Sequence, residues 1–138
     1  MNYNDLTTEK TNKNSRHLDR MTTREIVRVI NDEDKTVPFA VERELDDISR
    51  AIDLIADRLH NGGRLIYIGA GTSGRLGIID ATECPPTYGV SPELIQGVIA
   101  GGHPAMFRSS EGMEDIAEDA AADLDAVGFS CKDVCMAI

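Results

Sequence analysis

Two hydroxyl side chains, Thr72 and Ser73, lie in a glycine-rich segment that follows a short apolar run. The segment reads GAGTSG at 69–74, and the run at 65–68 is typical of a buried strand. A strand that turns through glycines into a helix presents free backbone N–H groups at the positive end of the helix dipole. With two hydroxyls beside them, these N–H groups favour binding of a phosphate monoester. The alternative interpretation is that the segment is an ordinary tight turn between a strand and a helix. The predicted phosphate-binding residues are Gly71, Thr72, Ser73 and Gly74.

Two carboxylates in the same chain could transfer protons. Glu83 is expected at the C-terminal end of the helix that begins at the glycine-rich segment. The negative end of the helix dipole and partial burial would both raise its pKa, as an acid catalyst requires. Glu114 lies near the start of a later helix, where a carboxylate is stabilised as an anion and suits a base. The alternatives are a surface glutamate that ends its helix and an acid that only caps one.

The glycine segment also satisfies the G-x-G-x-x-G pattern of dinucleotide-binding folds. That fingerprint needs an acidic residue about twenty positions on, at the end of the second strand, to bind ribose hydroxyls. Here the second apolar run, at 94–100, leads into Gly101-Gly102-His103, and Glu93 precedes the run. The absence of a Gly-Lys-Ser/Thr sequence argues against a nucleotide triphosphatase. A phosphate site is therefore favoured over a dinucleotide site.

Other residues near these segments give weaker signals. Arg75 could add charge to the phosphate site or could cap or pair elsewhere, and the sequence does not separate these roles. Among three histidines without ligand-like spacing, only His103 is expected near the site. Cys84, Cys131 and Cys135 have no disulfide-framework or zinc spacing, and the simplest interpretation of the last two is buried thiols in a reducing cytosol. No metal site is predicted.

Helices are expected before the glycine segment. Residues 1–16 are polar and expected to be flexible, and a first helix is predicted with Thr22 or Thr23 as its N-cap. A second, longer helix is predicted from a cap at Thr36 to a stop at Gly62. Its apolar seam packs either on the helix's own sheet, which we favour, or on another subunit. The seam consists of Val41, Leu45, Ile48, Ile52, Ile55 and Leu59.

Strands and helices are expected to alternate in the rest of the chain. In chain order the predictions are a strand at 65–68, a helix to about 81, a strand at 94–100, helices at 105–109 and 112–127, a stop at Gly128, and a strand from Asp133. This alternation predicts a parallel sheet with helices on its faces. Because the last strand reaches Ile138 with no following turn, we expect the chain to be part of a longer protein.

Composition narrows the class of partner. The chain has 138 residues, a formal net charge of −10 and 41% hydrophobic residues, which fits one globular domain. The acidic charge would repel nucleic acid and anionic membranes, so we expect neither as a partner. Residues 1–20 do not resemble a signal peptide, and no apolar run is long enough to span a bilayer. A cytoplasmic location is expected.

Four segments together resemble a known family. They are GAGTSGRLGIIDATECPPTYGV at 69–90, INDEDKTVPFAVE at 30–42, IAGG at 99–102 and EGMED at 111–115. From about Thr8 to its last residue the chain looks like the N-terminal half of the N-acetylmuramic acid 6-phosphate etherases. These belong to the sugar isomerase (SIS) fold group, with the glucokinase regulatory protein among their relatives. The resemblance implies an incomplete three-layer, flavodoxin-like α/β sandwich over 63–138, N-terminal helices over 17–62 and a flexible segment over 1–16.

The resemblance also implies a function. Family members are cytoplasmic homodimers that need no metal or other cofactor and remove the D-lactyl ether from the sugar phosphate during peptidoglycan recycling. By position, Glu83 matches the family's proton donor, Glu114 its second catalytic acid, and Thr72 and Ser73 the loop that contacts the phosphate. A second serine-rich turn completes the phosphate site in the family, and this chain stops before it. A non-catalytic sugar-phosphate regulator and an aldose–ketose isomerase are the alternatives, and the joint presence of both glutamates favours the etherase.

Overall fold

The structure is a computed structural model that describes residues 10–108 and 117–138. The chain divides into two compact units, Met1–Ser49 and Arg50–Ile138, which are treated separately below. Glu114 and the first part of the helix predicted at 112–127 lie outside the described residues.

The first unit is built from short helices. Two 3-10 turns, η3 (Lys13–Ser15) and η4 (Leu18–Arg20), precede α1 (Thr23–Asp34). The predicted N-cap is confirmed at Thr22, whose backbone N–H donates to the Glu25 carboxylate at 2.7 Å while its hydroxyl accepts from the Glu25 N–H at 3.4 Å. This reciprocal pair is a capping box, and it satisfies two donors that the helix start leaves free.

The long second helix predicted from Thr36 is wrong, because the chain forms two helices there. They are α2 (Val37–Glu42) and α3 (Leu45–His60). The Thr36 hydroxyl donates to the Glu33 carbonyl at 2.7 Å, and its backbone is already helical, so it makes no side-chain cap. At the break, the Glu44 N–H donates to the Val41 carbonyl at 2.9 Å, a tightened turn that ends α2.

Two glycines end helices as predicted. Gly62 has a φ of +80°, and the N–H groups of Gly62 and Gly63 donate to the carbonyls of Leu59 and Arg58, which is the Schellman pattern. Gly128, with a φ of +65°, ends α6 (Ala117–Ala126) by the same kind of bonds. No helix in the described parts of the chain is long and apolar enough to cross a bilayer.

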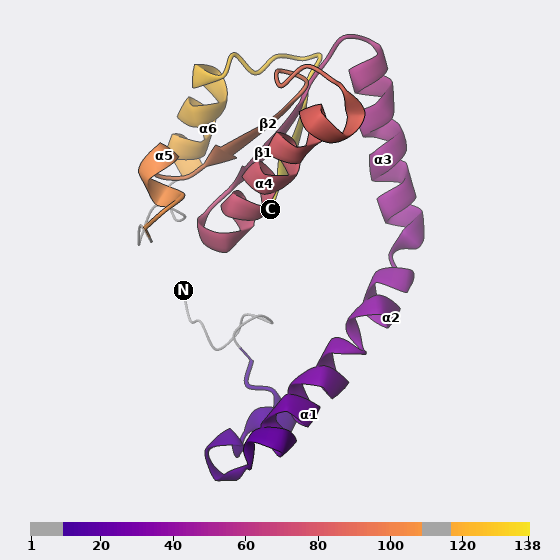
Figure 1. The fold of residues 1–138 in the computed structure, drawn as a ribbon. Coiled ribbons are helices and arrows are strands. Elements are labelled where there is room, and N and C mark those ends of the chain that lie inside the picture. Colours follow the sequence, from indigo (N-terminus) through magenta and orange to yellow (C-terminus); the bar gives the residue numbers. More distant parts are fainter. Residues whose placement is uncertain (1–9, 109–116) are drawn as a thin grey trace. The chain divides into compact units, whose positions relative to one another are not determined.

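The second unit contains the predicted parallel sheet. Its strands are β1 (Leu65–Gly69), β2 (Ile95–Ile99) and β3 (Val134–Ala137), in the order β2-β1-β3 (Figure 1). Both pairings are parallel, and Tyr67 of β1 lies opposite Gly97 of β2 and Met136 of β3. The result is an incomplete α/β domain of the expected class.

The helix α4 (Gly71–Tyr88) packs very closely on β1 and β2, as Figure 1 shows. A Cβ atom added at Gly74 would lie 2.5 Å from the Gly69 carbonyl oxygen, and one at Gly97 would lie 2.6 Å from the side chain of Ile78. Glycine at these positions lets the helix backbone approach the strands. The buried core residues are Leu65, Ile66, Ala81, Cys84, Ile99 and Ala105.

Two predicted helix positions need correction. The helix expected to end near Ala81 continues through Pro85 and Pro86 to Tyr88, and it ends only at Gly89, where φ is +67°. In place of the helix predicted at 105–109, the described residues form the short α5 (Gly102–Ala105), whose N-cap Gly101 and first residue Gly102 both have positive φ. Glycine geometry therefore sets these boundaries, and the prolines do not.

The apolar seam of α3 is only partly covered. Ile55 and Leu59 are half-buried, whereas Leu45, Ile48 and Ile52 are exposed. Within the second unit, a pocket of about 380 Å³ separates α3 from β3, with Leu54 and Ile55 on one side and Val134 to Met136 on the other. The favoured interpretation, a seam packed on its own sheet, is correct only for the C-terminal part of α3.

Candidate functional site

The glycine-rich segment lies at the point where the strand order reverses. After β1 the chain continues to β2 on one side, and it later returns to β3 on the other side of β1. In open α/β sheets, ligands bind outside the carboxyl ends of the strands at such a switch point. The Ile138 N–H donates to the Ile68 carbonyl at 3.0 Å, so the end of β3 lies beside the start of the segment.

The start of α4 presents several hydrogen-bond donors. Ala70 is the N-cap in extended backbone, Gly71 has a φ of +52°, and the Gly74 N–H donates to the Ala70 carbonyl at 3.1 Å. The N–H groups before Gly74 in the first turn have no acceptor within the helix. The methyl side chain of Ala70 cannot cap them. Thr72 is exposed and Ser73 half-buried, and within the described residues neither hydroxyl has a hydrogen-bond partner. This arrangement can hold an anion.

Gly74 contributes in a different way from its neighbours. Its N–H is already bonded to Ala70, and it is buried against Gly69 with no room for a Cβ atom. The third glycine therefore supports close packing of helix on strand, which the G-x-G-x-x-G pattern also requires in other proteins. The remaining donors of the predicted phosphate site come from Gly71 and Thr72, which are exposed, and from Ser73, which is half-buried.

Glu83 lies within α4, five residues before the end of the helix, and it is exposed. Its predicted position at the helix end and its predicted partial burial are both wrong. It lies eleven residues after Thr72, about 16 Å along the helix at about 1.5 Å per residue. Leu76 and Ile79, which are 57% and 53% exposed, lie between them on the same outward face of the helix.

A partly buried cluster of Tyr67, Asp80 and Cys84 joins β1 to the neighbouring face of α4. The Tyr67 hydroxyl donates to the Asp80 carboxylate at 2.7 Å, and the Cys84 thiol contacts the Asp80 carbonyl at 3.3 Å. Burial and the bond to Asp80 raise the pKa of Tyr67 well above its usual range, and burial raises the pKa of the Cys84 thiol. Tyr67 and Cys84 therefore stay protonated at neutral pH and join α4 to β1. The prediction of buried thiols is wrong for Cys131 and Cys135, which are exposed.

The side chain of Arg75 takes one of its two predicted roles, that of a cap. It donates to the backbone carbonyls of Ala105 at 2.7 Å, Met106 at 3.1 Å and Arg108 at 3.4 Å. These carbonyls follow or end α5. The sequence did not indicate this contact, because the partners lie 30 to 33 residues away and are backbone atoms.

Two other predicted residues are placed only in part. His103 is exposed in α5, at the carboxyl end of β2, where its ring lies 5.4 Å from that of Phe107. Glu114 lies outside the described residues, six positions after Arg108.

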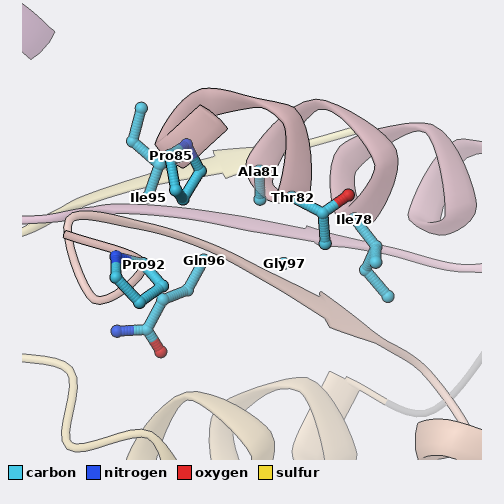
Figure 2. Close-up of a pocket in the computed structure, with 8 residues that line it drawn as sticks. All are labelled: Ile78, Ala81, Thr82, Pro85, Pro92, Ile95, Gln96 and Gly97. Atoms are coloured by element: carbon cyan, nitrogen blue, oxygen red, sulfur yellow. The ribbon is translucent and has the colours of Figure 1, made fainter. Parts of the chain in front are cut away.

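A pocket that the sequence did not indicate opens between α4 and β2. Figure 2 shows it flanked by the C-terminal half of α4 and by residues 92–97, and its volume is about 380 Å³. Thr82 and Pro85, close neighbours of Glu83 in the chain, line it, but none of the predicted site residues does. Its lining residues are Ile78, Ala81, Thr82, Pro85, Pro92, Ile95, Gln96 and Gly97.

Comparison with known proteins finds named relatives that cover most or all of this chain. Three relatives named N-acetylmuramic acid 6-phosphate etherase come from Clostridium beijerinckii (57% identical, 96% of this chain and 44% of the relative), Symbiobacterium thermophilum (59%, 91% and 42%) and Escherichia coli (54%, 100% and 46%). The chain spans a little under half the length of these curated relatives. They confirm the predicted resemblance to the N-terminal half of such proteins.

The sequence model that describes the N-terminal SIS domain of the glucokinase regulatory protein matches residues 47–138. This range contains the whole sheet and the glycine-rich segment at its switch point. The chain therefore belongs to the SIS-domain family that this description names.

Proposed function

We propose that this chain forms the N-terminal half of a lyase that cleaves the D-lactyl ether of N-acetylmuramic acid 6-phosphate. The products would be N-acetylglucosamine 6-phosphate and D-lactate, in the recycling of cell-wall sugars. The observation that carries the proposal is the identity of 54–59% over 91–100% of the chain with relatives of that name. The free donors at the start of α4 support it, because the substrate carries a phosphate.

The chemistry needs a phosphate anchor and two carboxyl groups. With the sugar ring open, the proton on C2 is acidic because it lies next to the aldehyde. A base removes this proton, the C3–O bond breaks, and an acid protonates the departing lactate oxygen. Water then adds to the C2=C3 double bond, with its proton on C2 and its hydroxyl on C3. We assign the acid to Glu83 and the base or water activator to Glu114.

We also propose that the site functions in a homodimer. A sugar phosphate bound at Thr72 would need to extend about 16 Å along α4 to meet Glu83 of the same chain, given about 1.5 Å of rise per residue. A second copy could bring its own Glu83 nearer. Leu76 and Ile79 on α4, and Leu45, Ile48 and Ile52 on α3, are exposed apolar residues that such a contact could bury.

Sedimentation analysis of Leu76→Glu and Ile52→Glu tests the dimer. A dimeric parent protein that becomes monomeric in one variant would identify the face involved. A monomeric parent protein would contradict the homodimer.

We infer a cytoplasmic location from the cysteines. All three are free, and Cys131 and Cys135 are exposed, which suits a reducing compartment. Cell fractionation would test this inference, and recovery of the protein outside the cytoplasm would refute it.

The second candidate function is a non-catalytic sugar-phosphate regulator. It is favoured by one observation, that the matching family description names a regulatory protein. A regulator would bind the sugar phosphate through Thr72 and Ser73 without releasing lactate.

D-Lactate release from N-acetylmuramic acid 6-phosphate separates the two functions. The assay uses this chain alone and this chain extended by the C-terminal part of the Clostridium beijerinckii relative, each with Glu83→Gln in parallel. Release that is lost in Glu83→Gln supports the lyase. Binding of N-acetylglucosamine 6-phosphate without any lactate release from the extended chain would instead support the regulator.

A further inference from the structure

The helix α3 carries an apolar stripe that the described residues leave largely open. Leu45, Ile48 and Ile52 recur at spacings of three and four along one continuous helix, so its own geometry places them on one side. Leu45 is 52% exposed and Ile52 58% exposed, whereas Ile55 and Leu59, which continue the stripe, are half-buried. Burial of the stripe against a partner would be favourable, because apolar area would leave water.

The spacing of the stripe is that of a contact between two helices. Alternating steps of three and four residues give a repeat of seven, in which the apolar side chains interlock with those of a second helix. The repeat begins just before α3, because the Ile48 N–H donates to the Glu44 carbonyl at 2.9 Å and so makes Glu44 part of the helical turn. Glu44, Ala51 and Arg58 follow one another at intervals of seven and flank the same edge of the stripe.

The side chains on that edge favour an antiparallel pair of identical helices. When two copies run antiparallel around a two-fold axis beside Ala51, Glu44 of each copy lies opposite Arg58 of the other. The same arrangement sets Ile48 of each copy opposite Ile52 of the other, so apolar residues meet along the centre. The small side chain of Ala51 lies at the axis, where it lets the two helices approach closely. The stripe is therefore complementary to itself.

A parallel pair of the same helices would be less complementary. Its flanking positions would set Glu44 opposite Ser49 and Ala51 opposite Ala56, so no opposite charges would meet on this edge. The flanking charges thus select the antiparallel orientation.

The two charged groups can meet only between copies. Glu44 and Arg58 are both exposed, and they lie about 21 Å apart along their own helix at about 1.5 Å of rise per residue. The Nη1 of Arg58 donates to the Cys131 carbonyl at 2.8 Å, which holds the side chain at this edge of α3. A guanidinium carries five N–H donors, so this bond is compatible with a second one to a carboxylate.

We propose that the homodimer forms through the two α3 helices, which pair antiparallel along the stripe with Glu44 of each copy facing Arg58 of the other. This inference rests on the homodimer proposed above and names the surface that it uses. The exposed residues Leu76 and Ile79 of α4 lie outside this surface.

Two single charge reversals test the pairing. Glu44→Arg sets arginine against arginine at both contacts of a homodimer, and Arg58→Glu sets glutamate against glutamate. Each variant alone should raise the dissociation constant of the dimer about 10- to 30-fold, because both contacts change from attraction to repulsion. An equimolar mixture of the two variants restores opposite charges at both contacts. It should therefore form a heterodimer about as tight as the parent homodimer, as measured by sedimentation and native mass spectrometry.

Asp53→Arg is the matched control. Asp53 is exposed and lies away from the stripe on α3, so the same reversal of charge there should leave the dissociation constant within about twofold. Circular dichroism of each variant checks that the helices still form. The measurements are made on this chain and on the chain extended by the C-terminal part of the Clostridium beijerinckii relative.

Several results would overturn the inference. One is a dimer whose dissociation constant is the same in the parent and in both reversals, and another is a mixture that forms no more heterodimer than either variant forms homodimer. Dimers of the extended chain that ignore the reversals would show that something else covers the stripe. All of these would contradict only the interface, whereas a parent that is monomeric at both lengths would contradict the homodimer itself. The lyase function is judged separately, by lactate release.

Discussion

Replacement of Asp133 should destabilise the second unit strongly, because its carboxylate is the acceptor at the centre of a hydrogen-bond network. The Asp133 side chain is 3% exposed and accepts five hydrogen bonds. Three come from Arg64, through its backbone N–H at 2.8 Å, Nε at 3.2 Å and Nη2 at 2.9 Å. Two come from Ser130, through its N–H at 2.9 Å and its hydroxyl at 3.0 Å.

The same network ties α6 to the sheet. Arg64 also donates to the carbonyls of Val127 and Gly128, which directly follow α6, and its own carbonyl accepts from the N–H of Val134 at the start of β3. Asp133→Asn removes the charge and turns an acceptor into a donor that faces other donors. Loss of one partner from a buried ion pair costs about 3–5 kcal/mol. Because Arg64 is 25% exposed and can regain some hydration, we expect about 2–4 kcal/mol.

The effect should depend on pH with a definite sign. The hydrogen bonds from Arg64 and Ser130 hold the pKa of Asp133 well below its usual range. A carboxyl whose pKa is lower in the folded state stabilises the fold fully above its unfolded pKa of about 4, and this stabilisation is lost as the pH falls toward the folded value. The deficit of Asp133→Asn should therefore be largest near neutral pH and shrink below about pH 4.

Urea unfolding between pH 7 and pH 3 measures this prediction. The control is Asp32→Asn, because the Asp32–Lys35 pair has a similar distance of 2.7 Å but is exposed, and it should leave the unfolding midpoint unchanged. A midpoint for Asp133→Asn equal to that of the parent protein would refute the reasoning. So would a deficit that stays constant across the pH range, since that would indicate lost packing instead of lost charge.

Three further predictions concern packing, binding and capping. Gly97→Ala should lower the free energy of unfolding by about 1–3 kcal/mol in urea, because the new methyl group would lie 2.6 Å from the Ile78 side chain; an unchanged midpoint would show that α4 can move away from β2. Thr72→Ala combined with Ser73→Ala should weaken binding of N-acetylglucosamine 6-phosphate at least about tenfold, as measured by calorimetry. The reason is that at least one hydrogen bond to the charged phosphate would be lost, and such a bond contributes about 1.5–3 kcal/mol. The melting temperature should not change, because within the described residues neither hydroxyl has a protein partner; unchanged affinity would exclude them from the phosphate site. Thr22→Ala should cost about 1 kcal/mol and speed amide exchange in the first turn of α1, and unchanged exchange there would contradict a stabilising capping box.

Local signals in the sequence predicted most of the fold. The three strands were found from short apolar runs, and the ends of α3 and α6 from single glycines at Gly62 and Gly128, because these features depend only on neighbouring residues. Thr36 failed as a cap because the Glu33 carbonyl lay within reach of its hydroxyl. The end of α4 was predicted near Ala81, whereas the helix continues through Pro85 and Pro86 and ends at Gly89.

Long-range contacts could not be predicted in this way. Arg64 meets Asp133 across 69 residues, and Arg75 meets backbone carbonyls that have no signature in the sequence. Side chains of this kind have several possible partners until the sheet order is known. The glycine-rich turn from β1 into a helix was therefore predicted correctly, its role as a phosphate site stays a prediction, and the contact of Arg75 with the backbone of residues 105–108 was missed.

The packing of α4 explains why the glycine pattern alone was ambiguous. Gly74 and Gly97 are required by the close approach of helix and strand, and any α/β protein with such an approach needs them, whether it binds a dinucleotide or a sugar phosphate. The discriminating residues are those whose side chains the packing does not use. Thr72 and Ser73 present hydroxyls at the helix start, and β2 leads into Gly101 and Gly102 with positive φ where a dinucleotide fold would place a carboxylate. In the proposed function, specificity for a phosphate monoester would therefore depend on a few polar atoms added to a backbone arrangement that could serve both kinds of ligand.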